Sequence, residues 1–337
     1  MVATDQGSKT FTTNLSGLSS GKTYYVQSYV KEYNASTASV EVRRGEVIGF
    51  TTWDTNTRRG WMELPRATSG SGYYSGEFYV GSGNSRTRNY SYLYEYSNYT
   101  SLWTAYPLYN GVMSTSKSVK GTTWAKNPDI AENKQINCWS ASYNVLYGSY
   151  TYVENAAGTG EEYYARGHNI PNADRINNDD MQTQTYYATN STPQIQNTFN
   201  STIWGKLEKD VRSVASATDT VYVVTGAAFH KGNGNENVTR ITPKGDPNKT
   251  VPVPNYYWKV LLKVKWSGKT ITSAKAVGVW IPHAKYDSND YSSYVTSVDQ
   301  IEAWTGFDFF ANLPGTNDSG IEKTAEENSS WAAFRDF

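Results

Sequence analysis

Residues 90–96 read Tyr-Ser-Tyr-Leu-Tyr-Glu-Tyr, so a tyrosine occupies every second position. Successive side chains of an extended chain point to opposite faces, and this alternation therefore predicts a β-strand with one aromatic face. Residues 102–106 follow after a short polar stretch and are expected to form the partner strand of a hairpin. The segment indicates a sheet with one tyrosine-rich side.

The rest of the chain extends this pattern. Apolar and β-branched runs predict further strands at residues 221–225, 256–266 and 274–281. Helix signals are fewer: one helix is expected at 200–215 with Asn200 as its N-cap, and another begins at Ser297 and stops at Gly306. Because strands outnumber helices and the two are interleaved, we expect an α+β domain built on a central antiparallel β-sheet with packed helices.

Composition argues against a histone-like or polyanionic protein and against a Cys/His zinc site. The 337 residues include 31 basic and 31 acidic side chains, so any affinity for nucleic acid has to come from a local patch. Hydrophobic residues make up 38% of the chain, enough for a packed core. One cysteine and three histidines exclude a Cys/His zinc cage, and Cys138 is expected to be a small buried residue.

The first 52 residues are expected to form a separate all-β segment. Residues 24–30 and 47–51 are strand-like runs, and Leu18 followed by a turn and Tyr24-Tyr25 resembles the late strands of a fibronectin type III sandwich. About 50 residues cannot supply the strands of such a sandwich. We therefore expect a partial fibronectin type III-like segment at 1–52 and a second domain at 53–337.

We expect neither a membrane helix nor a signal peptide in this sequence. No apolar run approaches the roughly 18 residues of a membrane helix, so no membrane span is expected. Residues 1–5 do not resemble a signal peptide, so an exported protein would be seen here in mature or truncated form. The tail after Pro314, which contains many Glu, Asn and Ser residues, is expected to be loosely held.

Three polar residues share one side of the helix expected at 200–215. Asn200, Glu208 and Arg212 are separated by multiples of four residues, and each step of four turns the direction by about 40° on an α-helix. An amide, a carboxylate and a guanidinium facing the loop residue His168 would suit a hydrated metal and a phosphate. The alternative is that Asn200 is only a cap and that the other two form a surface ion pair, worth roughly a few tenths of a kcal/mol.

Several ordered blocks resemble a known family. They are Arg166-Gly167-His168, the run Thr-Asn-Ser-Thr-Pro-Gln at 189–194, the helix with Asn200, Trp204, Glu208 and Arg212, the strand at 251–260 and the helix at 297–306. Over roughly residues 53–315 the chain resembles the DNA/RNA non-specific endonucleases. This resemblance implies an active site with a ββα-metal motif.

The resemblance implies catalytic chemistry for three side chains. His168 corresponds to the general base, Asn200 to the direct metal ligand and Glu208 to the carboxylate that orders metal-bound water. Neutral imidazole can accept a proton from water near physiological pH. A single amide ligand leaves most of the cation's charge for the substrate, which suits Mg²⁺, with Mn²⁺ as a substitute.

Further residues are implied to support this chemistry. Arg212 corresponds to an arginine that contacts phosphate, while Arg166 and Asn190 support the histidine and the catalytic loop. His230 and His283 match nothing catalytic and are expected to be structural or surface residues.

The implied substrates are DNA and RNA, bound through phosphate contacts and cut to 5′-phosphate and 3′-hydroxyl ends. Backbone contacts carry no base information, so sequence preference should be low. The basic surface is expected to come from Arg166, Arg175, Lys206, Lys209 and Arg212. The resemblance and the fibronectin-like segment together imply a secreted or periplasmic location, and a homodimer is left open.

Two positions depart from the family pattern. Ala165 stands where the family usually has Asp, and Thr122 stands where it often has Arg, with Lys120 nearby as a point charge. They leave open a catalytically attenuated relative that binds nucleic acid without cutting it. The aromatic richness leaves open a third possibility, a secreted carbohydrate-binding surface module.

Overall fold

The computed structural model describes residues 18, 23–51, 61–66, 68, 70–82, 86–113, 123–137, 162–218, 220–243, 245–268, 270–313 and 320–337. The chain divides into two compact units, Met1–Gly60 and Trp61–Phe337. The domain boundary expected after residue 52 stays a prediction, because residues 52–60 lie outside the described part.

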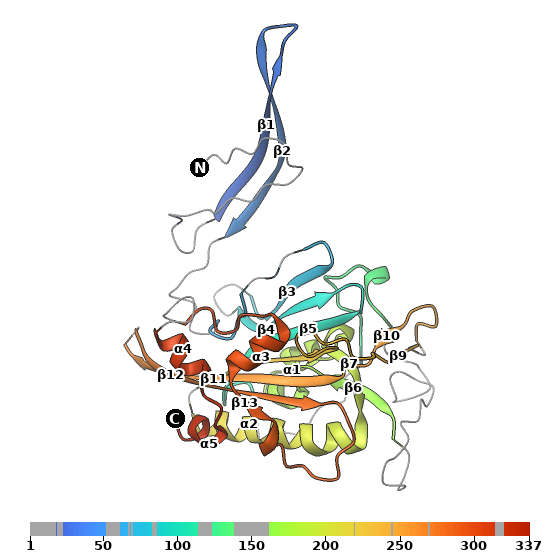
Figure 1. Cartoon of the computed structure of the whole chain (residues 1–337), viewed down its shortest axis with the longest axis vertical. Coiled ribbons are helices and arrows are strands. Elements are labelled where there is room, and N and C mark those ends of the chain that lie inside the picture. Colours follow the sequence, from blue (N-terminus) through green and yellow to red (C-terminus); the bar gives the residue numbers. More distant parts are fainter. Residues whose placement is uncertain are drawn as a thin grey trace. The chain divides into compact units, whose positions relative to one another are not determined.

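The first unit contains an antiparallel hairpin of β1 (Thr23–Asn34) and β2 (Ser39–Thr51) (Figure 1). Both strands contain the runs expected from the sequence. Large apolar side chains of the hairpin are exposed, among them Tyr25 at 73%. A two-stranded hairpin by itself is marginally stable in water. The fibronectin-like assignment of this segment stays a prediction.

The second unit is built on an antiparallel sheet. In the described residues it has seven strands in the order β13-β12-β11-β8-β5-β4-β3, each antiparallel to its neighbours. Their bounds are β3 Tyr73–Val80, β4 Thr87–Glu95, β5 Thr100–Leu108, β8 Val221–Ala228, β11 Tyr256–Ser267, β12 Thr270–Pro282 and β13 Val295–Thr296. The predicted hairpin of residues 90–96 with 102–106 is confirmed as β4 and β5, and so is the α+β class.

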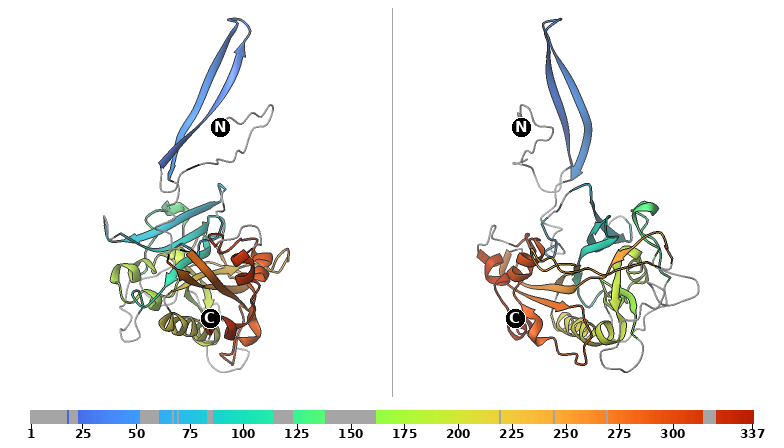
Figure 2. Two further views of the ribbon diagram at one scale, coloured as in Figure 1. Left: turned by 90° about the vertical axis from the view of Figure 1, so that its left-hand side faces the viewer. Right: turned by 45° about the vertical axis from the view of Figure 1, so that its right-hand side comes forward.

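One face of this sheet packs against the long helix α2 (Gly205–Ala217) (Figure 2). The tyrosines Tyr90, Tyr92 and Tyr94 of β4 are buried in the same apolar cluster as Leu207 and Val211 of that helix. The alternation seen in the sequence therefore arises because one face of β4 points into this cluster.

The opposite face packs against the C-terminal part of the chain. Trp258 and Trp280 belong to a second apolar cluster together with Ile301 of α3 (Val298–Thr305). As predicted, the Ser297 side chain accepts from the N–H of Gln300, and Gly306 ends the helix with φ 74°.

The expectation of a loosely held tail is wrong for the described residues 320–337. They form α4 (Gly320–Glu326) and α5 (Trp331–Arg335). Ala325 and Phe334 are fully buried, each in one of the two apolar clusters. The prediction rested on the polar composition of the tail. It failed because each of these short helices buries only one side, so most of its residues can be polar.

The remaining elements are short. They are the hairpins β6 (Tyr164–His168) with β7 (Ser191–Ile195) and β9 (Arg240–Ile241) with β10 (Val251–Pro252), the helix α1 (Asp179–Gln184), the 3-10 turns η3 (Glu132–Lys134), η4 (Asn172–Arg175), η5 (Ala188–Asn190) and η7 (Ser292–Tyr294), and the π-helix η6 (Gln196–Trp204). Within the described part, no helix has the length and apolarity to cross a membrane.

Gly226, in the middle of the sheet, offers a test of the packing. A Cβ at this position would collide with the carbonyl oxygen of Leu102 and lie 2.5 Å from Cζ2 of Trp258. Gly226→Ala should therefore lower the free energy of unfolding by about 3 kcal/mol, measured by urea unfolding with tryptophan fluorescence. Gly72→Ala is the control, because a Cβ there meets nothing within 4 Å. Equal stabilities of the two variants would contradict this packing.

Candidate active site

A ββα unit forms the centre of the candidate site. In the β6–β7 hairpin His168 pairs with Ser191, and β7 leads directly into η6 and then α2. The Thr192 hydroxyl lies 2.9 Å from the hydroxyl of Tyr257, which ties the hairpin to β11 of the large sheet. The ββα motif implied by the resemblance is consistent with this order of elements.

The helix begins earlier than predicted. Its first segment, η6, is a π-helix that begins at Gln196, so Asn200 is inside the helix and is not its N-cap. The N-terminus is instead satisfied by the buried carboxylate of Glu162, which accepts from the N–H of Asn197 and from the N–H and hydroxyl of Thr198 at 2.7–2.8 Å. A carboxylate at this end also complements the positive pole of the helix.

His283 fixes the junction between β7 and η6. Its Nε2 accepts from the N–H of Ile195 at 2.9 Å, and its Nδ1 lies 2.7 Å from the carbonyl oxygen of Pro254, to which it donates. Burial lowers the pKa of His283 to about 4, so the ring is neutral. His283 is therefore structural, as expected, and His230 is an exposed residue beside Glu236.

The imidazole of His168 packs against two aromatic rings. Its centroid lies 4.7 Å from that of Trp124 and 5.0 Å from that of Tyr186. Its Nε2 is buried and has no hydrogen-bond partner among the described residues. Burial, and to a smaller extent the charge of Arg166, lowers the pKa of His168 to about 3, so the ring is neutral at physiological pH. The Arg166 guanidinium lies 5.4 Å from the centroid of the Trp124 ring.

Asn190 fixes the chain that follows His168. Its Oδ1 accepts from the N–H of Ile170, and its Nδ2 donates to the carbonyl oxygens of Ile170 and Thr185, at 2.8–3.1 Å. Its own carbonyl accepts from the N–H of Asn169 at 2.9 Å. This buried amide therefore holds the loop that follows His168, and its part in catalysis stays a prediction.

Asn200 presents its amide from the π-helix. Its Nδ2 donates to Oε1 of Gln196 at 3.1 Å, and this bond leaves Oδ1 as the atom suited to a cation. The wider i→i+5 winding changes the direction of Asn200 relative to Glu208 from that of continuous α-helix. The step of about 40° expected from the sequence therefore applies within α2, from Glu208 to Arg212, whereas the winding between Asn200 and Glu208 is different.

A buried group of charges lies beneath α2. Arg212 donates to Oδ1 of Asp174 at 2.8 Å, and the hydroxyl of Tyr106 donates to Oδ2 at the same distance; the Asp174 side chain is only 3% exposed. Glu208 interacts electrostatically with this pair. Burial raises the pKa of Glu208 to about 7, although the positive charges of Lys259 and Arg212 oppose the shift.

Sequence reasoning missed Asp174 and Lys259. Lys259 is buried in β11, donates to the Thr225 hydroxyl at 3.1 Å and lies 4.6 Å from the centroid of the Trp204 ring. Burial lowers its pKa. A lysine inside the apolar run 256–262 was a readable signal, because an unpartnered charge is costly in a buried strand. Nothing local marked Asp174.

The expected basic surface needs one correction. Arg175 is 1% exposed, and its guanidinium donates to Asn89 and to backbone carbonyl oxygens of Asn89, Asp174 and Pro107. It supports the core and cannot contact a substrate. Lys206 is bound to Asp210 at 2.6 Å, while Lys209 is exposed. Lys120, Thr122 and Cys138 lie outside the described residues.

This domain thus consists of an antiparallel sheet with an attached ββα unit. The unit carries His168, Asn200 and Glu208. The model of the DNA/RNA non-specific endonuclease family matches residues 69–316. The chain therefore belongs to that family.

Several curated proteins are similar to parts of the chain. A nuclease of Nostoc sp. is 30% identical over 168 residues, which cover 48% of this chain and 56% of that protein. The mitochondrial endonuclease G of Caenorhabditis elegans is 30% identical and a nuclease of Serratia marcescens 29%, covering 39% and 44% of this chain and 41% and 52% of theirs. The chain thus spans about half the length of the curated relatives it matches.

One solved structure has a similar fold. It comes from the crystal structure of the EndoG/EndoGI complex, with a TM-score of 0.50 and 21% identity, over 66% of this chain and 84% of that chain. At this identity the likeness concerns the fold alone.

The Asp174–Arg212 pair can be tested by stability. Asp174→Ala should lower the free energy of unfolding by about 3–5 kcal/mol, because it leaves a largely buried guanidinium without its carboxylate. Urea unfolding measures the loss. Glu132→Ala, which removes the exposed partner of Lys126, should have a far smaller effect. Similar losses for the two variants would show that the Asp174 pair is not an internal one.

Proposed function

We propose that the chain is a metal-dependent, sequence-non-specific endonuclease that hydrolyses phosphodiester bonds of DNA and RNA to 5′-phosphate products. The observation that carries this proposal is His168: a neutral imidazole with a buried Nε2 that has no partner in the described residues, within the ββα unit of a nuclease family. Such a nitrogen can accept a proton.

His168 acts as the general base that takes the proton from the attacking water. Its low pKa keeps it unprotonated but also makes it a weak base. A phosphodiester bound beside the ring brings negative charge, which favours the imidazolium form and raises this pKa toward neutrality. The base therefore becomes effective when substrate is present.

Asn200 and Glu208 suit a hard divalent cation, because an amide oxygen and a carboxylate are the donors that Mg²⁺ prefers. In this proposal Asn200 holds the ion through Oδ1, and Glu208 accepts from water around it. When bound, the cation stabilises the negative charge that develops on the phosphate and the leaving oxygen. Mg²⁺, with Mn²⁺ as a substitute, is the proposed cofactor. That His168 and Asn200 face one ion stays a prediction.

The remaining residues position the substrate and the base. Arg212 contacts a phosphate oxygen while it keeps its pair with Asp174, and Arg166 supplies positive charge beside the histidine. Asn190 keeps the loop after His168 in place. Contacts of this kind read the backbone and not the bases, so binding should weaken steeply with salt. A secreted or periplasmic location and a homodimer stay predictions.

His168→Ala should reduce Mg²⁺-dependent nicking of a supercoiled plasmid by about 100-fold or more, because the general base is lost. His230→Ala is the matched control, since His230 is exposed and pairs with Glu236, and it should nick like the unmodified chain. A chelator should abolish nicking. Plasmid retardation without nicking by the unmodified chain would favour the attenuated binder, and neither signal would favour the carbohydrate-binding module.

Ala165→Asp should lower the Mg²⁺ concentration for half-maximal nicking by about tenfold, because a carboxylate at this position can accept hydrogen bonds from water around the ion. Ala165→Asn, which has a similar size and no charge, is the control and should have a smaller effect. Identical Mg²⁺ titrations of Ala165→Asp and the unmodified chain would remove position 165 from the metal's surroundings.

A further inference from the structure

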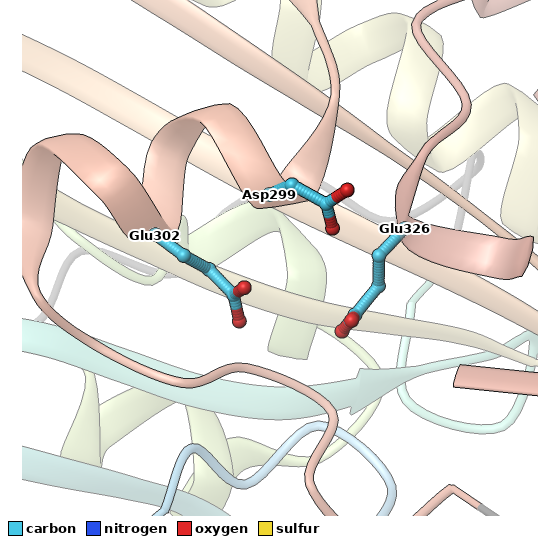
Figure 3. A group of neighbouring side chains, drawn as sticks. All are labelled: Asp299, Glu302 and Glu326. Carbon is cyan, nitrogen blue, oxygen red and sulfur yellow. The ribbon is translucent and has the colours of Figure 1, made fainter. Parts of the chain in front are cut away.

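A second group of acidic side chains lies on α3 and α4, the C-terminal helices. Asp299 and Glu302 come from α3 and Glu326 from α4, and one carboxylate oxygen of each lies within 4.8 Å of the other two. Figure 3 shows the three carboxylates turned toward the same space between the helices. None of the three is among the residues of the candidate active site.

Glu326 distinguishes this group from an ordinary acidic surface. Glu326 is only 2% exposed, and its Oε1 is buried without a hydrogen-bond partner among the described residues. A buried carboxylate without a partner is costly, since it has lost its water and gained nothing in exchange. Such an atom requires either a proton or a cation.

The charges around Glu326 make the requirement stronger. Burial and the negative charges of Glu302, Glu322, Asp299 and Asp308 all raise the pKa of Glu326, to about 10. The cations nearby in the described residues are engaged elsewhere: Arg66 is bound to Asp308, and Lys323 pairs with the exposed Glu327 at 3.6 Å. A divalent cation would compensate the repulsion that these carboxylates exert on one another.

We propose that Asp299, Glu302 and Glu326 bind a structural Ca²⁺ ion that joins α4 to α3. Carboxylate oxygens are the ligands of hard cations, and Ca²⁺ accepts irregular sets of them at about 2.3–2.6 Å. Two ligands of one Ca²⁺ ion can therefore lie up to roughly 5 Å apart, which accommodates the observed spacing. Mg²⁺ demands shorter bonds and near-octahedral geometry, so it suits this site less well.

Two contacts suit this site to holding the end of the chain against α3. Glu302 is already oriented, because its Oε1 accepts from the N–H of Phe309 at 2.5 Å. Glu326 ends α4, and its neighbour Ala325 is buried against the same apolar cluster as Ile301 of α3. An ion between the two helices would thus reinforce an apolar contact that exists without it.

The experiment is thermal unfolding of the full chain after treatment with a chelator and its removal, with Ca²⁺ alone as the probe. Saturating Ca²⁺ should raise the midpoint by about 5 °C. Glu326→Gln should abolish that rise, and without Ca²⁺ it should be about as stable as the unmodified chain, because the neutral amide resembles the protonated carboxyl that burial of Glu326 favours. Glu327→Gln, an exposed change on the next residue, should keep the rise.

Asn200→Ala separates this site from the catalytic one, and it should also keep the rise. Should Glu326→Gln fail to fold, Asp299→Asn provides the same test at a partly exposed ligand. Tryptophan-sensitised Tb³⁺ emission that Ca²⁺ displaces should appear with the unmodified chain and be lost with either ligand variant. No rise in the unmodified chain, an equal rise in Glu326→Gln, or a rise with Mg²⁺ but not with Ca²⁺ would overturn the proposal.

Discussion

The carboxylate of Asp174 is the contact on which the candidate active site depends. It binds Arg212 of α2 and the Tyr106 hydroxyl of the sheet, both at 2.8 Å, in a place that water scarcely reaches. Separating two charges in such surroundings costs much free energy, because each would be left without solvent or partner. Asp174 follows His168 by six residues and Arg212 follows Asn200 by twelve. The pair therefore fixes η4, which follows the strand that ends at His168, against α2, which continues the helix that carries the proposed metal ligand.

The start of the helix is held by polar contacts of a similar kind. Glu162 binds the first N–H groups of η6, and His283 binds the N–H of Ile195 just before it. The pKa of His283 is about 4 in the folded chain, below the ordinary 6.5. Its contribution to stability is therefore present above pH 6.5 and is lost as the pH falls toward 4. The contact that holds the start of this helix is consequently strongest at neutral pH, where the imidazole of His168 is also neutral.

Local patterns predicted the parts of the fold that local physics determines. Tyrosine alternation predicted β4, and the serine and glycine that bound α3 predicted its ends, since each depends on neighbouring residues. Asn200 was interpreted wrongly as a cap, because the group that satisfies this helix is Glu162, 34 residues before its first residue, Gln196. Arg175 was placed on the surface because composition does not reveal Asn89 as its partner. The roles of His168 and Asn190 were predicted from the resemblance, and they stay predictions.

Gly205, at the change from π-helix to α-helix, has a consequence for protein engineering. A Cβ at this position would lie 2.8 Å from the carbonyl oxygen of Asn200. Glycine normally weakens a helix by roughly 0.5–1 kcal/mol relative to alanine, so replacing it is a common way to make a protein more heat-resistant. Here the same replacement would push on the backbone of the residue proposed to hold the metal. Any helix stability that Gly205→Ala adds would therefore come with a displaced backbone at Asn200, and so with a misplaced metal ligand.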